Sequence, residues 1–225
     1  MSTLLLDQGI EIPTIHTLEE FRRWSRSEGF PPRGRIDYVS GRIEIDMSPE
    51  DVFTHGTLKA EVATAIKRRV DELDLGHTFI AETRVSSAAA DLSAEPDVMV
   101  ISHQSLEQGR VRLVPKATGE PDRYVEVEGG PDLLVEIVSD SSEQKDLQRL
   151  PQAYFTAGVR ELWLIDARGA ELRCRIHHRA ADAFAGVIED AHGDQPSGVL
   201  EAGVRLERSR HARGHWTYRL HLKPF

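Results

Sequence analysis

The fold is decided by residues 131–166, which read PDLLVEIVSDSSEQKDLQRLPQAYFTAGVRELWLID. Two apolar runs of strand length, 133–138 and 161–166, enclose a polar turn at 139–142 and a helical pattern that ends at Gly158. Two strands joined by a helix form a βαβ unit, in which the strands are parallel and buried. We therefore expect an α/β protein organised around this unit.

One acidic side chain, Glu136, interrupts the first apolar run. A buried carboxylate is costly unless it is paired or bound to a metal. Asp97 opens another apolar run, 98–101, and an adjacent strand would bring it to Glu136. Two converging carboxylates are typical Mg²⁺ ligands, with water and phosphate completing the coordination. The alternatives are a turn role for Asp97 and a buried ion pair for Glu136.

A second Pro-Asp pair, at Pro131-Asp132, competes with Asp97. Asp132 and Glu136 share a strand face, but four residues span roughly 13 Å along a strand, which is too far for one ion. We therefore interpret Asp132 as structural.

Three other side chains are candidates for the same site. Lys145 begins the helical segment after Glu136, where its ammonium could orient an attacking water or a phosphate. His55 opens a predicted helix, and Glu61 on that helix could be an outer metal or base partner. Each also has an ordinary interpretation: a solvated lysine beside Asp146, a cap neighbour and a surface glutamate.

The rest of the chain predicts further elements around the βαβ unit. Pro151 lies within the helical pattern and predicts a kink or two short helices. Residues 1–170 are expected to form the core, and 171–225 an irregular β-rich extension packed on the same domain. The predicted elements are a capped helix at 17–26, a hairpin at 35–47, a helix at 56–73, a strand at 77–81, a loop at 86–94, short arms at 110–114 and 124–128, and extension arms at 171–177, 203–207 and 216–222.

Composition narrows the class of protein. The chain has 225 residues, 40% of them hydrophobic and 29% charged, as in ordinary globular proteins. Its apolar runs are too short to span a membrane, and residues 1–13 lack the pattern of a secretory signal. Cys174 is the only cysteine, so no intrachain disulfide is expected. These features favour a cytoplasmic protein, and the net charge of −9 argues against a non-specific nucleic-acid binder.

Several motifs taken together resemble the Uma-two family of "putative endonucleases", a mostly bacterial group. The similarity covers about residues 15–168 and is most specific over 131–166. The matching motifs are Met47-Ser48-Pro49, His55 at a helix start, Pro96-Asp97, the PDLLVEIVS run, Tyr154, Ala157-Gly158-Val159, Glu161-Leu162-Trp163 and Asp166.

The resemblance implies a restriction endonuclease-like fold of the PD-(D/E)xK superfamily, with a mixed sheet flanked by helices. It also implies a nuclease that hydrolyses DNA with Mg²⁺ or Mn²⁺ held by Asp97 and Glu136, and a homodimer. The superfamily lysine normally follows the second carboxylate by two residues, where this chain has Val138. The later position used by the family reads Leu150-Pro151, so Lys145 is the available substitute.

Two functions follow from these observations. The first is a metal-dependent endonuclease that uses Asp97, Glu136 and Lys145. The second is a non-catalytic interaction or regulatory module that keeps the fold, favoured by the acidic charge and the displaced lysine. Whether the lysine lies in the cleft with both carboxylates distinguishes them.

Overall fold

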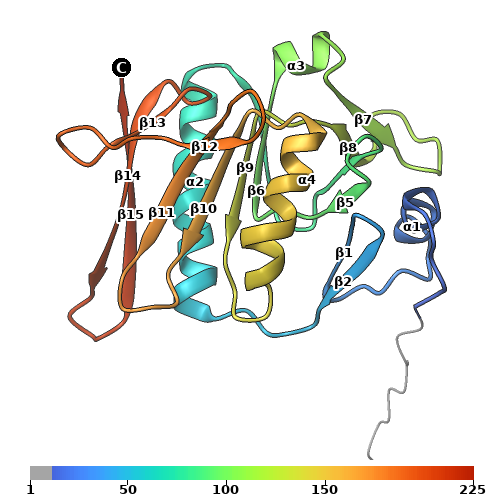
Figure 1. The fold of residues 1–225 in the computed structure, drawn as a ribbon, viewed down its shortest axis with the longest axis horizontal. Coiled ribbons are helices and arrows are strands. Elements are labelled where there is room, and N and C mark those ends of the chain that lie inside the picture. The colour runs from blue at the N-terminus through green and yellow to red at the C-terminus, as the bar shows by residue number, and fades with distance from the viewer. Residues whose placement is uncertain (1–11) are drawn as a thin grey trace, which may run out of the picture.

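The predicted βαβ unit is at the centre of the structure, a computed structural model that describes residues 12–225 (Figure 1). Strands β9 (Leu133–Ile137) and β10 (Glu161–Asp166) are parallel neighbours. A π-helical turn, η2 (Lys145–Arg149), and helix α4 (Leu150–Ala157) connect them. Pro151 lies in the first turn of α4, where its missing N–H is tolerated, so two short helical segments replace one long helix. Gly158 ends α4 at a φ of 93°, which glycine adopts readily.

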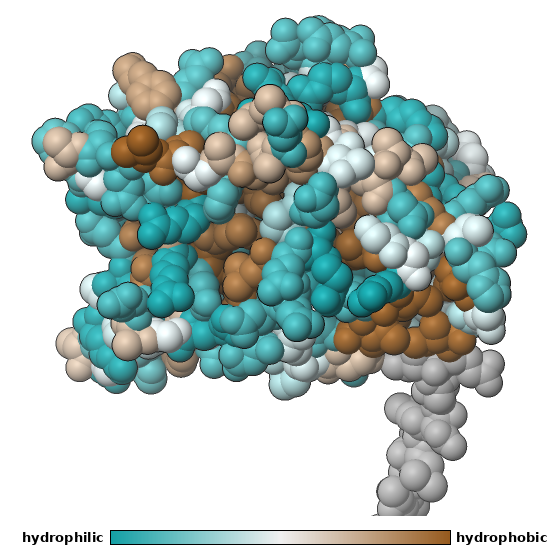
Figure 2. Space-filling model, viewed as in Figure 1, coloured by the Kyte–Doolittle hydropathy of each residue, from teal (hydrophilic) through white to brown (hydrophobic). Residues whose placement is uncertain are grey.

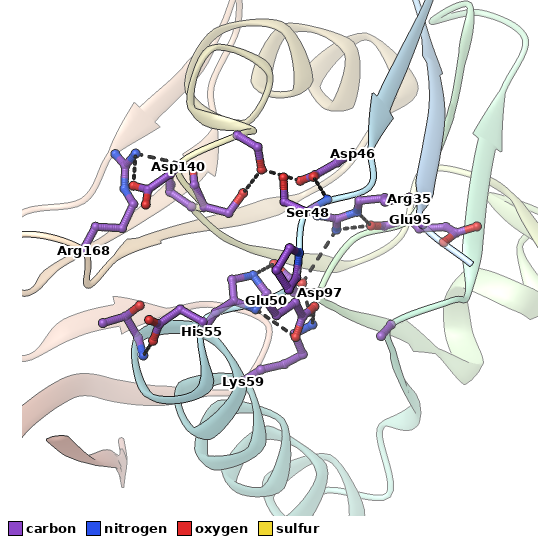
Figure 3. Close-up of a pocket in the computed structure, with 18 of the residues that line it drawn as sticks. Arg35, Asp46, Ser48, Glu50, His55, Lys59, Glu95, Asp97, Asp140 and Arg168 are labelled. Carbon is purple, nitrogen blue, oxygen red and sulfur yellow. Dashed lines mark hydrogen bonds and ion pairs between the residues drawn. The ribbon is translucent and has the colours of Figure 1, made fainter. Parts of the chain in front are cut away.

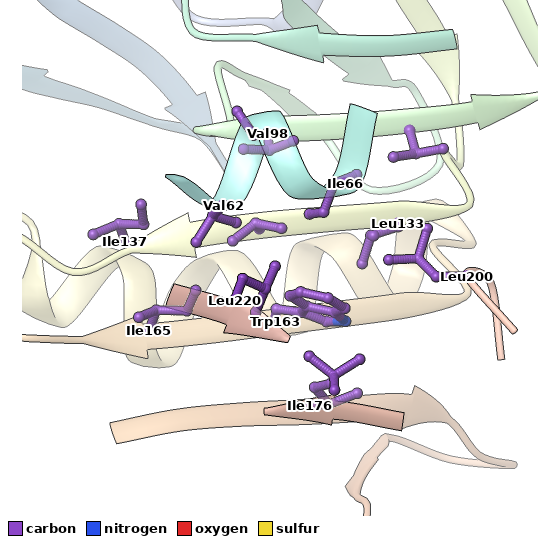
Figure 4. Close-up of a cluster of buried hydrophobic side chains, with 14 of the residues drawn as sticks. Val62, Ile66, Val98, Leu133, Ile137, Trp163, Ile165, Ile176, Leu200 and Leu220 are labelled. Atoms are coloured by element: carbon purple, nitrogen blue, oxygen red, sulfur yellow. The ribbon is translucent and has the colours of Figure 1, made fainter. Parts of the chain in front are cut away.

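These two strands belong to a six-stranded mixed sheet with the order β12-β11-β10-β9-β6-β3. The other members are β3 (Gly76–Ile80), β6 (Val98–Ser102), β11 (Arg173–Arg179) and β12 (Phe184–Gly186). Alternate side chains of β9 enter two different cores. Leu133, Val135 and Ile137 pack with helix α2 (Thr57–Glu72), and Leu134 packs on the α4 side (Figure 4).

A second six-stranded sheet carries the N-terminal elements, in the order β2-β1-β5-β4-β8-β7. It contains the predicted hairpin and the pair formed by the short arms. Helix α1 (Leu18–Ser25) begins with the predicted capping box of Thr17 and Glu20 and packs Phe21 against this sheet beside Tyr38. The strands are β1 (Arg35–Val39), β2 (Arg42–Asp46), β4 (Arg84–Ser87), β5 (Leu92–Ala94), β7 (Val111–Pro115) and β8 (Tyr124–Gly129); helix α3 (His103–Glu107) precedes β7.

The C-terminal part forms a third sheet, β13-β14-β15, that packs on α2. Its strands are β13 (Gln195–Ser197), β14 (Ala202–Arg210) and β15 (Trp216–Pro224). Leu200, Val204 and Leu220 from this region join the core of α2 and the central sheet. The α2 helix is thus covered on one side by the central sheet and on the other by the C-terminal sheet.

The predicted α/β class, with mixed sheets, flanking helices and a β-rich C-terminal region, is confirmed. The loop predicted at 86–94 is wrong, because parts of that segment form β4 and β5, whose small side chains are buried between neighbouring strands. No helix within residues 12–225 is long and apolar enough to cross a membrane. The predicted absence of a secretory signal concerns residues that are mostly outside the described range, so it stays a prediction.

Candidate functional site

Asp97 and Glu136 come from neighbouring antiparallel strands. Val98 of β6 pairs with Val135 of β9, so the next step of the register brings Asp97 opposite Glu136. The Asp97 amide donates to the Val135 carbonyl (3.1 Å), and its Oδ2 accepts from the Ile137 amide (2.7 Å). The backbone therefore fixes the Asp97 carboxylate beside β9.

Arg35, at the start of β1, lies between the two carboxylates. Its Nη2 is 3.7 Å from Asp97 Oδ1 and 3.3 Å from Glu136 Oε2. The guanidinium also donates to the backbone carbonyl of Glu95 through Nε (2.8 Å), and the Tyr154 hydroxyl donates to Glu136 Oε1. The two acids thus share one cation, and Glu136 is fully buried beneath it.

The surroundings shift the pKa values of Glu136 and Asp97 in opposite directions. Burial raises the pKa of Glu136 to about 8, although the Arg35 charge acts in the opposite direction. Burial alone would also raise the pKa of Asp97, but Arg35 and His55 outweigh it and hold that pKa well below its usual range. Asp97 is therefore the ionised member of the pair at neutral pH.

Lys145 is buried and contacts a different acid. Its Nζ donates to Asp37 Oδ2 at 2.7 Å and lies 3.9 Å from Asp146 Oδ1. Burial alone would lower the pKa of Lys145, but the Asp37 carboxylate raises it above its ordinary value. Lys145 therefore neither points to solvent nor forms an ion pair with Asp97 or Glu136. Its ion pair is with Asp37, which Arg35 also contacts.

A pocket of about 640 Å³ opens beside Asp97 (Figure 3). Neither Glu136 nor Lys145 lines it. His55 is in a π-helical turn, η1 (Val52–Gly56), that Asp51 caps through the Phe53 and Thr54 amides. The charged and histidine side chains that line the pocket are Arg35, Asp46, Glu50, Asp51, His55, Lys59, Glu82, Glu95, Asp97, Asp140 and Arg168.

Three of these side chains could bind a divalent cation. Glu50, His55 and Asp97 each offer a ligand atom, and these atoms lie within 4.8 Å of one another. Two carboxylate oxygens and an imidazole nitrogen form a donor set that suits a divalent metal.

The hydrogen bonding of His55 supports this fit. Its Nε2 lies 3.1 Å from the Ile137 carbonyl, an acceptor, so in the neutral ring Nε2 carries the proton. The buried Nδ1 has no hydrogen-bond partner among residues 12–225 and faces Glu50 Oε2 at 3.3 Å. A free Nδ1 lone pair beside a carboxylate suits a metal ion. Burial alone would lower the pKa of His55, but Asp97 raises it above its ordinary value, so a metal ion bound at Nδ1 would have to displace a proton.

Lys59, one helical turn beyond His55, already provides a positive charge at this position. Its Nζ is 2.5 Å from Glu50 Oε1 and 3.2 Å from Asp97 Oδ1. The ammonium therefore lies between two of the three metal-ligand candidates, where a cation is stabilised by both acids. Metal binding there would require Lys59 to move toward the pocket.

Glu61 and Asp132 lie outside this group. Glu61 Oε1 accepts from the Leu220 amide of β15 at 2.9 Å, so it joins α2 to the C-terminal sheet. Asp132, before the first residue of β9, accepts from the Ser102 amide (2.7 Å) and the Ser105 hydroxyl (2.9 Å). Asp132 thus has the structural environment expected of it.

Sequence reasoning missed Arg35, Glu50 and Lys59. The i, i+4 spacing of His55 and Lys59 places both on one helix face and could have indicated Lys59. Arg35 alternates with Asp37 on a short strand, which is also the pattern of a solvated hairpin. Glu50 precedes the helix in a polar segment, and no local signal distinguishes it from a surface residue.

Comparisons with known proteins agree with this architecture. A crystal structure of a "putative nuclease belonging to DUF820" from Anabaena variabilis is similar, with a TM-score of 0.59 and 20% identity over 82% of this chain and 90% of that one. At that identity the similarity shows the shared fold. No curated protein matches significantly. The Uma2 family model, described as "Putative restriction endonuclease", matches residues 18–209, and the chain therefore belongs to the Uma2 family.

Proposed function

We propose that the protein is a metal-dependent nuclease that hydrolyses phosphodiester bonds in DNA. The main supporting observation is the group of Glu50, His55 and Asp97. These side chains line a pocket whose volume of about 640 Å³ can hold a phosphodiester and a water molecule. Membership of a family described as "Putative restriction endonuclease" supports the substrate class.

Asp97 is the central ligand in this proposal, because it belongs both to the Asp97–Glu136 pair and to the pocket group. Glu50 and His55 would complete the protein ligands for Mg²⁺ or Mn²⁺. Glu136 would reach the same ion only if the Arg35 guanidinium moved away. We therefore propose that Glu136 positions Arg35 beside Asp97, with direct metal binding by Glu136 as the alternative.

When bound, a divalent cation would stabilise charge on the scissile phosphate and favour ionisation of a water molecule. Water would lose a proton to solvent as it adds to phosphorus, the bond from phosphorus to the leaving nucleotide oxygen would break, and that oxygen would take up a proton from solvent. Lys59, displaced toward the pocket, would orient this water or the phosphate as a point charge. Lys145 would act at a distance, by neutralising Asp37 beneath Arg35.

Across the pocket, Arg168 can hold the other side of the phosphate. Asp166 accepts from its Nε (3.0 Å) and Nη2 (2.9 Å), so the side chain is oriented before substrate arrives. Its Nη1 contacts Asp140 and Glu143, which are exposed side chains that a phosphate could replace.

One experiment tests the metal and the reaction separately. Mn²⁺ binding is measured by calorimetry, and cleavage of plasmid and of labelled linear DNA is measured with Mg²⁺, Mn²⁺ or EDTA. Asp97→Asn should weaken metal binding at least about tenfold and abolish cleavage. Asp140→Asn removes the same charge at an exposed position of the pocket rim and should preserve metal binding. Equal metal binding by wild type and Asp97→Asn would refute the site.

Glu136→Gln distinguishes the two tasks proposed for Glu136. If Glu136 only holds Arg35, the amide retains an acceptor and metal affinity stays within a few-fold of wild type. If it is a direct ligand, metal affinity falls as far as in Asp97→Asn.

The second candidate function is a non-catalytic module of the same fold. It is favoured by Arg35 and Lys59, which neutralise Asp97 without any metal. Absence of both metal binding and cleavage in the folded wild type would establish it.

A nuclease that cuts both strands would further need two sites, so we also propose a homodimer, tested by sedimentation with and without DNA.

A further inference from the structure

The segment 208–219, RSRHARGHWTYR, has a charge opposite to that of the whole chain. It contains four arginines and two histidines and no acidic residue, in a protein of net charge −9. It forms the facing ends of β14 and β15 and the turn between them, and we name it the basic hairpin tip. Figure 1 shows this turn at the lower end of the molecule, where α2 also begins, and Figure 2 shows a mostly hydrophilic surface there.

Two of the four arginines of the tip are held by an aromatic side chain. The Arg208 and Arg210 guanidinium carbons lie 4.2 Å and 4.0 Å from the ring centre of Trp216. Arg210 also donates through Nη1 to the Gly214 carbonyl at 2.7 Å. Arg210 and Arg213 are exposed, so their remaining donors face solvent. Holding Arg208 and Arg210 in advance reduces the entropy lost on binding a ligand.

Two contacts fasten the tip beside the pocket. The His215 ring stacks on Phe53, with centres 4.7 Å apart and planes 4° from parallel. Phe53 lies in η1, two residues before His55. On the other face, Arg208 Nη1 donates to the Ala167 carbonyl at 2.9 Å, next to the pocket residue Arg168. The tip therefore contacts two segments that border the pocket: η1, and the residues that follow β10.

We propose that the basic hairpin tip binds the phosphate backbone of DNA adjacent to the pocket and so directs the substrate to it. This proposal rests on the proposed nuclease function. Arg210 and Arg213 would each neutralise a phosphate, and the guanidinium fork matches phosphate oxygens. The net charge of −9 opposes DNA binding by the molecule as a whole, so a local cluster of arginines favours the orientation in which the tip meets the phosphates.

The test measures DNA binding without cleavage. Fluorescence anisotropy of a labelled 20-base-pair duplex is recorded in EDTA over a range of salt concentrations, for wild type and for the double variant Arg210→Ala/Arg213→Ala. The double variant should bind at least about tenfold more weakly at ~100 mM salt. The slope of log K against log salt should fall by about 1.8, which corresponds to two lost phosphate contacts.

A matched control removes the same charge elsewhere. Arg23→Ala/Arg112→Ala changes exposed arginines on α1 and β7, on the opposite side of the molecule in Figure 1. It should leave the affinity and the salt slope close to wild type. Equal losses in both double variants, or no duplex binding by wild type, would overturn the proposal. Tip-dependent binding without any metal-dependent cleavage would retain it and refute the nuclease function alone.

Discussion

Two lysines lie near Asp97, and their surroundings predict opposite consequences of removing them. Lys145 is enclosed with Asp37, and truncating it would leave a buried carboxylate whose remaining cation, Arg35, lies 3.9 Å away instead of within hydrogen-bond distance. Breaking such a pair costs about 3–5 kcal/mol, so Lys145→Met should lower the free energy of unfolding by that order. Urea denaturation followed by circular dichroism measures this loss.

Lys59→Met should instead affect the chemistry. Lys59 borders the pocket, its partner Glu50 is half exposed, and its other partner, the buried Asp97, keeps Arg35 nearby, so the stability loss should be smaller than that of Lys145→Met. Mn²⁺ should bind more tightly, because the competing ammonium is gone, while cleavage should fall by about 100-fold or more. Full cleavage by Lys59→Met, together with an inactive but folded Lys145→Met, would show that Lys145 and not Lys59 assists the attacking water.

These lysines show how far residue-level prediction from the sequence reaches. The proximity of Asp97 and Glu136 could be predicted, because strand length and spacing exclude Asp132. The partner of Lys145 could not, since Asp37 is 108 positions away and its strand resembles a solvated hairpin. Lys145 follows Glu136 closely in the sequence and was therefore expected beside it, whereas its ion pair is with Asp37.

Among the elements, β10, β11 and the segment after β13 meet at Glu161. Its carboxylate accepts from the Ser197 hydroxyl (2.6 Å) and the Gly198 amide (2.9 Å), and lies 3.3 Å from His178 Nε2. The neighbouring Glu161 carboxylate raises the pKa of His178 above its ordinary value, although burial opposes it. Folding therefore favours the protonated imidazole.

The sign of the resulting pH dependence follows from that shift. The contribution of His178 is fully present below pH 6.5 and is lost as pH rises through the higher folded pKa. His178→Gln should lack this decline when unfolding midpoints are compared with wild type between pH 5.5 and 8.5. His177→Gln is the control: burial lowers the pKa of His177, so its removal should change the pH slope in the opposite direction.

Glu61 gives a second prediction at this scale, because it joins α2 to β15. Among the described strands β15 pairs only with β14, and the Leu220 amide is satisfied by Glu61 Oε1. Glu61→Ala should lower the free energy of unfolding by about 1–3 kcal/mol, the cost of an unsatisfied amide. Cleavage and metal affinity should not change, and Thr64→Ala, at an exposed position of α2, should not lower the stability. Weakened metal binding in Glu61→Ala would instead support the accessory role expected from the sequence.

For the whole molecule, the central sheet was easier to predict than the first sheet. The βαβ unit has long apolar runs whose only buried arrangement is parallel strands. Strands β4 and β5 are short and rich in serine and alanine, and they are buried by partners far along the chain. The N-terminal sheet therefore depends on tertiary contacts that no local pattern contains.

The C-terminal sheet raises the question of whether residues 171–225 are separable from the core. Val204 and Leu220 pack into the same hydrophobic cluster as Val62 and Ile66 of α2. Removing the sheet would expose that face of α2, so we predict that the chain unfolds as one cooperative unit. Trp216 on β15 reports the C-terminal sheet, in a variant carrying Trp24→Phe and Trp163→Phe.

In that variant, Trp216 fluorescence and the helical circular dichroism signal should give coincident urea transitions. Because Trp163 is buried in the core, its replacement will lower the midpoint, but both probes should shift together. A Trp216 transition at lower urea than the helical one would show that the extension unfolds on its own. The basic hairpin tip would then belong to a separable part of the protein. DNA binding by the tip next to the pocket would in that case depend on how often the C-terminal sheet is folded against α2.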